Sequence, residues 1–250
     1  MEIKIEKNTE TLFYKREEQY FITIELFISI LAFNILLWTN KILHKLFIKY
    51  NLKYALLPFD KRRYVIKNVN KSIWLFSMTF FAVYILVDAL IYNYWNNGMI
   101  HIMGIVYGIP DTVALFIVPN LPLSTKVHHF VVTLLYIINV FQDVSQFHYW
   151  RAIIIYAIFS ILSGSVNGYL GFRLVCPDSM QPYKNAFKRF AYYNYIICFV
   201  SIWVYQYYII ITWIYTKSMW EIGFVIYMIL SHLIMYDDLV LIKFLRKHAS

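Results

Sequence analysis

Seven stretches of mostly apolar residues recur along the chain, separated by shorter polar segments. A helix needs about 20 apolar residues to cross the ~30 Å hydrocarbon core of a bilayer. The pattern therefore predicts an all-α integral membrane protein with about seven transmembrane helices. The predicted spans are Tyr20–Thr39, Ser72–Tyr92, Met99–Asn120, Lys126–Gln142, Tyr149–Leu170, Tyr192–Tyr215 and Trp220–Ile242, of which the fourth is the shortest.

The composition agrees with this pattern. Of the 250 residues, 60% are hydrophobic and 20% are aromatic, whereas only 15% are charged. The mean hydropathy is +0.55. A soluble domain of this length carries a larger charged fraction, so a soluble protein is excluded.

Lysine and arginine are distributed unevenly between the two sides that seven spans would define. Of the 23 basic residues, six fall on the N-terminal side and seventeen on the other side. Cytosolic segments next to membrane spans carry such an excess of Lys and Arg. We therefore expect a lumenal or exterior N-terminus and a cytosolic C-terminus.

The net charge of +9 and the pI of about 9.3 do not indicate a nucleic-acid-binding protein. The basic residues lie beside predicted spans, where attraction to anionic lipid headgroups accounts for them. Membrane lipids are therefore the expected partners and nucleic acid is not. The sequence leaves open a homodimer.

We predict three segments: an exterior N-terminal segment (1–19), the first span with a basic cytosolic loop (20–70), and a six-helix membrane domain (71–247). Within the loop, lysines recur at every fourth residue, at positions 41, 45, 49 and 53. This spacing fits either a basic amphipathic helix lying in the membrane interface or a solvated linker.

Five of the polar side chains inside the predicted spans lie toward the predicted cytosolic side, whereas Glu25, Asp88 and His101 lie toward the lumenal side. Polar groups within spans usually face a bundle interior or a water-filled cavity. At ~1.5 Å per residue, Asp111 lies ~14 Å, His129 ~5 Å and Asn167 ~5 Å from the predicted cytosolic boundary. On the same scale, His232 lies ~15 Å and Asp237 ~8 Å from it. All five depths fall in one half of the bilayer, which predicts a polar cavity that opens toward the cytosol.

The adjacent pair His128 and His129 is the strongest candidate for chemistry. Successive helical residues are ~100° apart, so both rings reach one cavity only at an angle. One imidazole could pair with Asp111 while the other serves as a base, nucleophile or hydrogen-bond donor. The alternative is a pair of interface histidines near lipid headgroups. No metal is expected, because no further His or Cys accompanies the pair at ligand spacing.

Two other polar groups have competing interpretations. Ser163 and Asn167 belong to a strip of small and polar residues in the fifth span, which either lines the cavity or packs against another helix. Asp237 and Asp238 lie near the cytosolic boundary, where at least one of them is expected to pair with Lys243 or Arg246.

Several short motifs resemble the TLC-domain family, named for translocation-associated membrane proteins, longevity-assurance ceramide synthases and a ceroid-lipofuscinosis protein. The resemblance covers about residues 71–247 and includes the aspartate-bearing last span before a basic tail. The motifs are an aspartate-bearing helix, a paired-histidine helix and a Ser-rich Val-Asn segment, at Gly108–Asp111, Lys126–Leu135 and Ser163–Asn167. The resemblance implies a TLC-type helical bundle that resides in the endoplasmic reticulum.

In the ceramide synthases of that family, the histidine pair is followed one helix later by acidic residues, and these groups are implicated in acyl transfer from acyl-CoA to a sphingoid amine. The pair maps onto His128 and His129. The acidic positions fall near Ile161–Gly164, a stretch that contains no carboxylate. The resemblance therefore favours the non-synthase branch, whose members are linked to lipid composition, lipid sensing or cargo handling.

Three functions follow from these observations. The first is binding or handling of a long-chain lipid in membrane lipid homeostasis, without a cofactor. Its expected site comprises Asp111, His128 and His129 at the polar head, with Ser163, Asn167, His232 and Asp237 as further lipid-binding residues. The second is an acyl-CoA-dependent N-acyltransferase, with acyl-CoA as substrate, His128 or His129 as base or nucleophile and Asp111 as orienting partner. The third is a membrane receptor or chaperone for secretory cargo.

Overall fold

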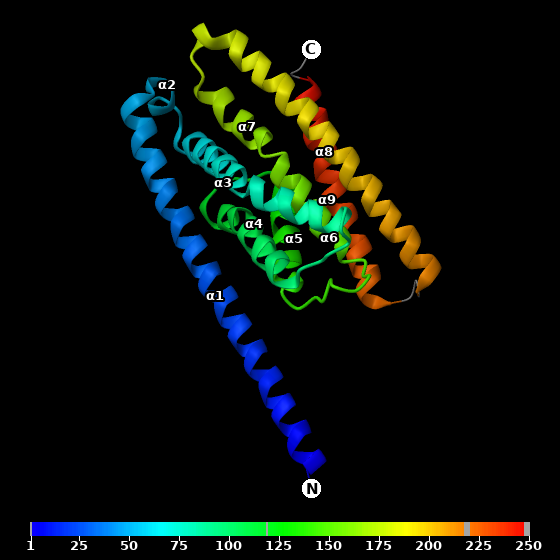
Figure 1. Ribbon diagram of the computed structural model, residues 1–250. Helices are drawn as coiled ribbons and strands as arrows, with labels where there is room; N and C mark the ends of the chain where they lie inside the picture. The colour runs from blue at the N-terminus through cyan, green and yellow to red at the C-terminus, as the bar shows by residue number, and fades with distance from the viewer. Residues whose placement is uncertain (1, 119, 218–220, 248–250) are drawn as a thin grey trace.

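The computed structural model describes residues 2–118, 120–217 and 221–247, with side chains from residue 23 onward. Within these ranges the chain forms helices and turns but no strand (Figure 1). The helices are α1 (Glu2–Tyr50), α2 (Leu52–Ala55), α3 (Phe59–Leu90), α4 (Asn97–Ile117), α5 (Leu123–Asn139), α6 (Arg151–Leu162), α7 (Ser165–Val175), a 3₁₀ turn (Asp178–Met180), α8 (Gln181–Thr216) and α9 (Ile222–Lys247).

The described residues contain six helical segments that are long and apolar enough to cross a membrane, rather than about seven. The predicted run Lys126–Gln142 forms α5, which has 17 residues and packs against α4 and α9. At 1.5 Å per residue α5 is ~25 Å long, which is short for an independent span. The six segments are Thr23–Tyr50, Phe59–Leu90, Asn97–Ile117, Arg151–Val175, Asp178–Thr216 and Ile222–Lys247. The all-α class is confirmed, and six such helices agree with a multi-pass membrane protein.

The first helix is longer than predicted at both ends. α1 continues through residue 20, where an N-terminal segment was expected to end, and through Lys41 to Tyr50. The first three lysines of the predicted loop therefore extend α1, so neither a separate interfacial helix nor a linker forms there. Only the short α2 follows, capped where the Asn51 side chain accepts a hydrogen bond from the Tyr54 amide at 2.8 Å. Trp220, the predicted start of the last span, lies outside the described residues.

One end of the bundle, here called the basic end, gathers the turns that follow α1, α4 and α7. Lys53 on α2 donates hydrogen bonds to the Cys176 carbonyl at 3.0 Å and to Asp178 at 2.8 Å. Asn120, in the α4–α5 turn, donates to Asp60 at the start of α3 at 3.2 Å. Segments far apart in sequence thus meet at one end, as the predicted alternation of loops requires.

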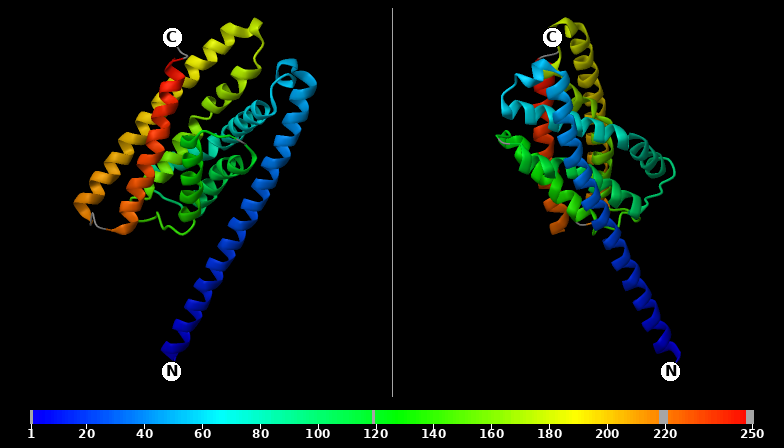
Figure 2. Two further views of the ribbon diagram at one scale, coloured as in Figure 1. Left: turned by 180° about the vertical axis from the view of Figure 1, so that it is seen from behind. Right: turned by 90° about the vertical axis from the view of Figure 1, so that its left-hand side faces the viewer.

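The opposite end gathers the other turns. Asn97, at the start of α4, donates to Asp143 at 2.7 Å in the segment between α5 and α6. Tyr149, in the same segment, packs edge-on against Phe224 of α9 with ring centroids 5.4 Å apart. Both views in Figure 2 show α1 extending beyond the rest of the bundle on this side, while α8 and α9 run beside each other.

The predicted fifth span is broken in two at Ser163 and Gly164, between α6 and α7. α3 packs closely against the break: a Cβ on Gly164 would lie 2.9 Å from Leu75 Cβ. The carbonyl of Gly164 accepts a hydrogen bond from Ser72 on α3 at 3.0 Å. Irregular backbone at membrane depth is tolerated where protein groups satisfy it or where it lines a cavity, and this break does both.

The core of the bundle surrounds α6, which is buried on nearly every side by α3, α4 and α8. Next to it, two glycines on α4 let α5 approach closely. A Cβ on Gly104 would lie 2.8 Å from the side-chain nitrogen Nδ2 of Asn139, and a Cβ on Gly108 would overlap the Tyr136 ring. Small residues of this kind allow helix backbones to pack closely. This contact sets the register in which α5 presents its histidines to Asp111.

Candidate functional site

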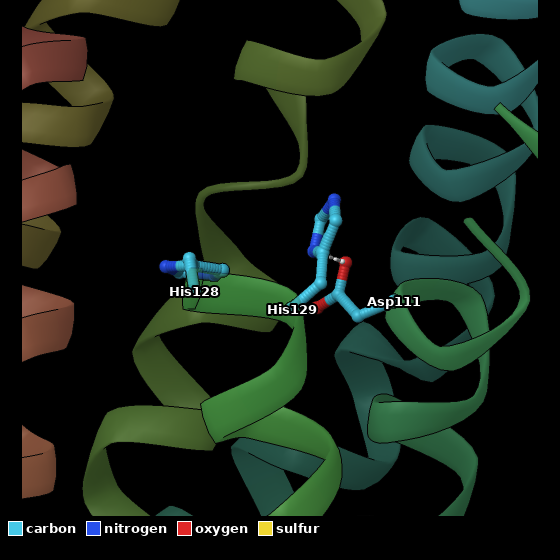
Figure 3. A group of neighbouring side chains, drawn as sticks. All are labelled: Asp111, His128 and His129. Carbon is cyan, nitrogen blue, oxygen red and sulfur yellow. Dashed lines mark ion pairs between the residues drawn. The ribbon is translucent and has the colours of Figure 1, made fainter. Parts of the chain in front are cut away.

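Asp111 and His129 meet across the α4–α5 interface. His129 Nδ1 lies 2.8 Å from Asp111 Oδ1, and both side chains are buried. Figure 3 shows the His129 ring beside the carboxylate, whereas the His128 ring points away from it. The predicted proximity of the aspartate to one imidazole of the pair is confirmed, and it follows from the glycine-mediated approach of α5 to α4.

Two lysines on α3 complete this cluster, and the sequence analysis did not single them out. Lys71 Nζ lies 2.5 Å from Asp111 Oδ1. Lys67 Nζ lies 3.0 Å from His129 Nε2. A neutral imidazole with its proton on Nδ1 accepts a hydrogen bond from Lys67 at Nε2, while Nδ1 lies close to Asp111 without the geometry of a hydrogen bond. Asp111 therefore balances the Lys71 charge and lies beside the His129 ring.

His128 has a different carboxylate partner. Its Nδ1 lies 3.3 Å from Asp237 Oδ2 on α9. The rings of His128 and His129 are edge-to-face, with centroids 5.6 Å apart and planes inclined at 79°. The angular separation of adjacent helical residues thus sends one imidazole toward α4 and the other toward α9, each to its own aspartate.

His128, His129, Lys67, Lys71 and Asp237 line a cavity of about 610 Å³, here called the first cavity, whereas Asp111 contacts two of these residues but does not line the cavity itself. Ser163 and Asn167, from the broken helix, line it as predicted. Its polar lining consists mainly of side chains from α3, α5 and α9, and its apolar lining comes from α3, α7, α8 and α9. Other lining residues include Lys61, Lys67, Lys71, His128, His129, Arg173, Asp237 and Asp238, and Leu75, Val166, Leu170, Phe199, Ile202, Leu241 and Phe244.

His232 does not belong to this site, although it was predicted to bind lipid with Asp237. It is exposed, it does not line the first cavity, and its Nδ1 contacts the Met228 carbonyl of its own helix at 2.7 Å. The two residues are five positions apart, which is a rotation of ~140° around a helix axis. Depth alone placed them together, but they occupy different faces of α9.

Asp238 is a cavity residue with an unexpected partner. Its carboxylate accepts a hydrogen bond from the Tyr195 hydroxyl of α8 at 2.7 Å, and both side chains are buried. The expectation that Asp237 or Asp238 pairs with Lys243 or Arg246 is wrong, because both carboxylates turn inward from the basic tail. The only sequence signal for this inward pairing was the adjacency of the two aspartates.

Asp111, His128 and His129 also form a cluster of potential metal ligands, which spacing along the chain did not suggest. Their ligand atoms lie within 4.8 Å of one another. Two imidazoles and one carboxylate are a ligand set that several transition metals accept. However, the ammonium groups of Lys71 and Lys67 already contact Asp111 and His129 Nε2, so a divalent cation would face two nearby positive charges. The arrangement suits an anionic or polar ligand better than a metal.

The arrangement can support binding or proton transfer. Each imidazole is held beside a carboxylate, an arrangement that orients a histidine to act as a base or hydrogen-bond partner. Lys67 and Lys71 add positive charge beside the first cavity. A comparison with family models, curated proteins and solved structures finds no match to this chain. We therefore infer function from the site itself.

Proposed function

We propose that this protein binds or handles a long-chain lipid in the first cavity, in the service of membrane lipid homeostasis. The observation that supports this proposal most directly is the composition of the cavity wall, which carries lysines and imidazoles in one part and aliphatic and aromatic side chains in another. The volume of about 610 Å³ lies within the ~300–1,000 Å³ of typical small-molecule sites. An amphiphile matches both parts of such a wall.

The polar head of the ligand would lie at His128, His129 and Lys67. Its hydrocarbon chain would lie along the apolar wall, where Leu75 and Ile202 are buried. Ser163 and Asn167 at the broken helix would offer further hydrogen-bond partners to the head. Because the cavity adjoins the basic end, where Lys and Arg gather, this assignment implies access from the cytosol.

The test is to purify the full chain in mild detergent and to identify the co-purifying lipids by mass spectrometry. His128→Ala and His129→Ala are each expected to lose one lipid class. His232→Ala is the matched control, because it removes an exposed imidazole from outside the cavity. An unchanged lipid profile in both cavity variants would contradict the proposal, and so would an equal loss in the control.

A second function, acyl-CoA-dependent N-acyl transfer, is favoured by the two imidazole–carboxylate pairs. Asp111 on α4 and Asp237 on α9, each beside one imidazole, would serve in place of the carboxylates missing from Ile161–Gly164. In such a reaction the amine nitrogen attacks the thioester carbonyl, the thiolate of coenzyme A leaves, and an imidazole accepts the proton from nitrogen. A TLC-type bundle in the endoplasmic reticulum, with a lumenal N-terminus, would suit either function.

Adding an acyl-CoA and a sphingoid base to the same preparation separates the two functions. An amide product that disappears in His128→Ala or His129→Ala, but not in His232→Ala, would establish the transferase. Retention of a specific lipid without any product would leave lipid binding as the function.

A further inference from the structure

A second cavity of about 520 Å³ lies between α1, α3 and α4, on the other side of Lys67 and Lys71 from the first cavity. These two lysines and Val118 line both cavities, and all the other residues of the second cavity are its own. The residues that line it are Leu36, Leu37, Asn40, Lys41, His44, Phe59, Arg62, Arg63, Ile66, Lys67, Asn70, Lys71, Pro110, Val113, Ala114, Phe116, Ile117 and Val118.

Hydrogen bonds between helices fix the relative positions of the walls of the second cavity. Asn70 on α3 contacts α1 through its amide nitrogen, 3.1 Å from the Leu36 carbonyl and 2.9 Å from Asn40 Oδ1. Nearer the start of α3, Arg63 donates to the Ile117 carbonyl at the end of α4 at 2.7 Å. The three helices are thus fixed to one another at both the inner and the outer part of the cavity.

The lining of this cavity is positively charged. It contains five lysine and arginine side chains and no aspartate or glutamate, whereas the first cavity has Asp60, Asp237 and Asp238 in its wall. The nearest buried carboxylate, Asp111, is already bound by Lys71. Arg62 Nε is buried and has no hydrogen-bond partner among the described residues. A ligand that carries negative charge and several acceptor oxygens would satisfy these groups.

Apart from Asn40, His44 and Asn70, the rest of the lining is apolar. Leu36 on α1 and Val113 and Ala114 on α4 are buried hydrophobic residues of this wall. Arg63, Lys67 and Lys71 follow one another at every fourth position, so their cationic groups lie along one face of α3 over ~12 Å of depth. A charged head near the start of α3 and a hydrocarbon chain along α1 and α4 would match this gradient.

We propose that the second cavity binds a glycerolipid whose phosphate headgroup carries a net negative charge. The phosphate lies among Lys41, Arg62 and Arg63, because a basic pocket between helices at a basic membrane face recognises such headgroups. One acyl chain lies against Leu36 and Val113. We infer this site independently of the lipid-binding function proposed for the first cavity.

The test measures binding of dioleoyl phosphatidic acid to the detergent-solubilised full chain by native mass spectrometry. Lys41→Gln combined with Arg62→Gln is expected to weaken binding about thirtyfold, which corresponds to about 2 kcal/mol for two basic residues. Lys45→Gln combined with Lys49→Gln removes the same charge from exposed positions on α1 outside the cavity, and is expected to leave the affinity close to that of the unchanged chain.

A second pair of variants tests the apolar wall. Ile117→Trp adds bulk inside the cavity and is expected to exclude the lipid. Ile229→Trp adds the same bulk at an exposed position of α9 and is expected to have no effect. If the Lys45→Gln, Lys49→Gln control weakened phosphatidic acid binding as much as the Lys41→Gln, Arg62→Gln variant does, the proposal would be overturned. General surface charge would then explain the binding.

Head and tail probes separate the possible sources of the ligand chemistry. Dioleoyl phosphatidylcholine, with a net neutral headgroup, and dioleoylglycerol, with no phosphate, are both expected to bind weakly. Glycerol 3-phosphate is expected not to displace phosphatidic acid. Displacement by glycerol 3-phosphate would indicate a site for a soluble phosphate instead, and equal binding of phosphatidylcholine would remove the role of charge. Because none of these variants touches His128 or His129, failure here leaves the first cavity unaffected.

Discussion

Two of the buried polar clusters among the described residues lie toward opposite ends of the bundle and differ in what surrounds them. At the opposite end, His101 Nδ1 lies 3.1 Å from Glu25 of α1, and its Nε2 lies 3.0 Å from the Gln142 carbonyl. Neither His101 nor Glu25 lines the first or second cavity. The Asp111 cluster instead borders open space on both sides of Lys67 and Lys71. Burial of polar groups is common to both clusters, so an adjoining cavity is the feature that distinguishes a candidate site.

Arg151 extends this contrast. Its guanidinium donates to the carbonyls of Val144 at 3.0 Å and Ser145 at 2.8 Å, and it lies 4.5 Å from the centre of the Trp95 ring. Backbone acceptors and an aromatic face thus satisfy the cation without any ligand. The arrangement fixes the loop that joins α5 to α6, which is a structural function. Variants at the opposite end should therefore change stability without changing lipid binding, whereas variants of the cavity histidines should change lipid binding.

The largest expected effect comes from breaking the Lys71–Asp111 pair. Asp111→Ala leaves the Lys71 ammonium buried without a carboxylate, a change that typically costs about 3–5 kcal/mol. The measurement is the free energy of unfolding in detergent. Replacing both residues, as Asp111→Leu with Lys71→Met, is expected to recover much of the loss, because no charge then remains unpaired. A single variant as stable as the original chain, or a double variant no better than the single one, would contradict the pairing.

The next effect concerns the opposite end. Arg151→Gln is expected to lower the free energy of unfolding by about 1.5–3 kcal/mol, since hydrogen bonds from a charged donor are lost. The lipid profile is expected to stay unchanged, in contrast to the cavity histidine variants. Arg189→Gln, at an exposed position of α8, serves as the control for the loss of one charge. Loss of a lipid class in Arg151→Gln would erase the distinction between the two clusters.

The sequence predicted most of the helices and the proximity of Asp111 to one imidazole of the pair, because hydropathy and depth both report position along the membrane normal. It missed Lys67 and Lys71 for a related reason. α3 begins at Phe59 rather than Ser72, so residues counted as a basic loop belong to the helix. Hydropathy ends a span at its first cluster of charges, even when buried partners on other helices balance those charges.

Rotation about a helix axis is what the depth argument could not supply. It grouped His232 with Asp237, although only Asp237 faces the cavity. It also could not show the break at Gly164, whose free carbonyl is satisfied by Ser72 of α3, a contact between segments far apart in sequence. Side-chain direction and long-range contacts therefore had to come from the structure.

A smaller effect tests how the α4–α5 contact positions the site. Gly108→Ala places a methyl group into the Tyr136 ring, and overpacking of this kind costs about 1–3 kcal/mol. The displaced helix would also separate His129 from Asp111, so lipid retention should fall with stability. Adding Tyr136→Ala makes room for the methyl group and is expected to restore retention. Failure of this rescue would show that the separation of α4 and α5 does not set the site.

The smallest effect lies at the opposite end, outside the spans. Hydrogen bonds from Asn97 and from Ser145 lower the pKa of Asp143 to about 2. A carboxyl whose pKa is lower in the folded state stabilises the fold above its unfolded value, and this contribution disappears as the pH falls toward 2. Asp143 is exposed, so solvent screening keeps the contribution small.

Asp143→Asn should therefore be slightly less stable than the original chain at pH 6, and the difference should narrow as the pH approaches 2. Unfolding midpoints measured at several pH values provide the check, with Glu221→Gln as the control for an exposed carboxylate at the same end of the bundle. A difference that stays constant across this range would mean that the Asn97–Asp143 contact does not depend on the charge. Lipid retention should not follow this titration, since Asp143 lines neither of the two cavities.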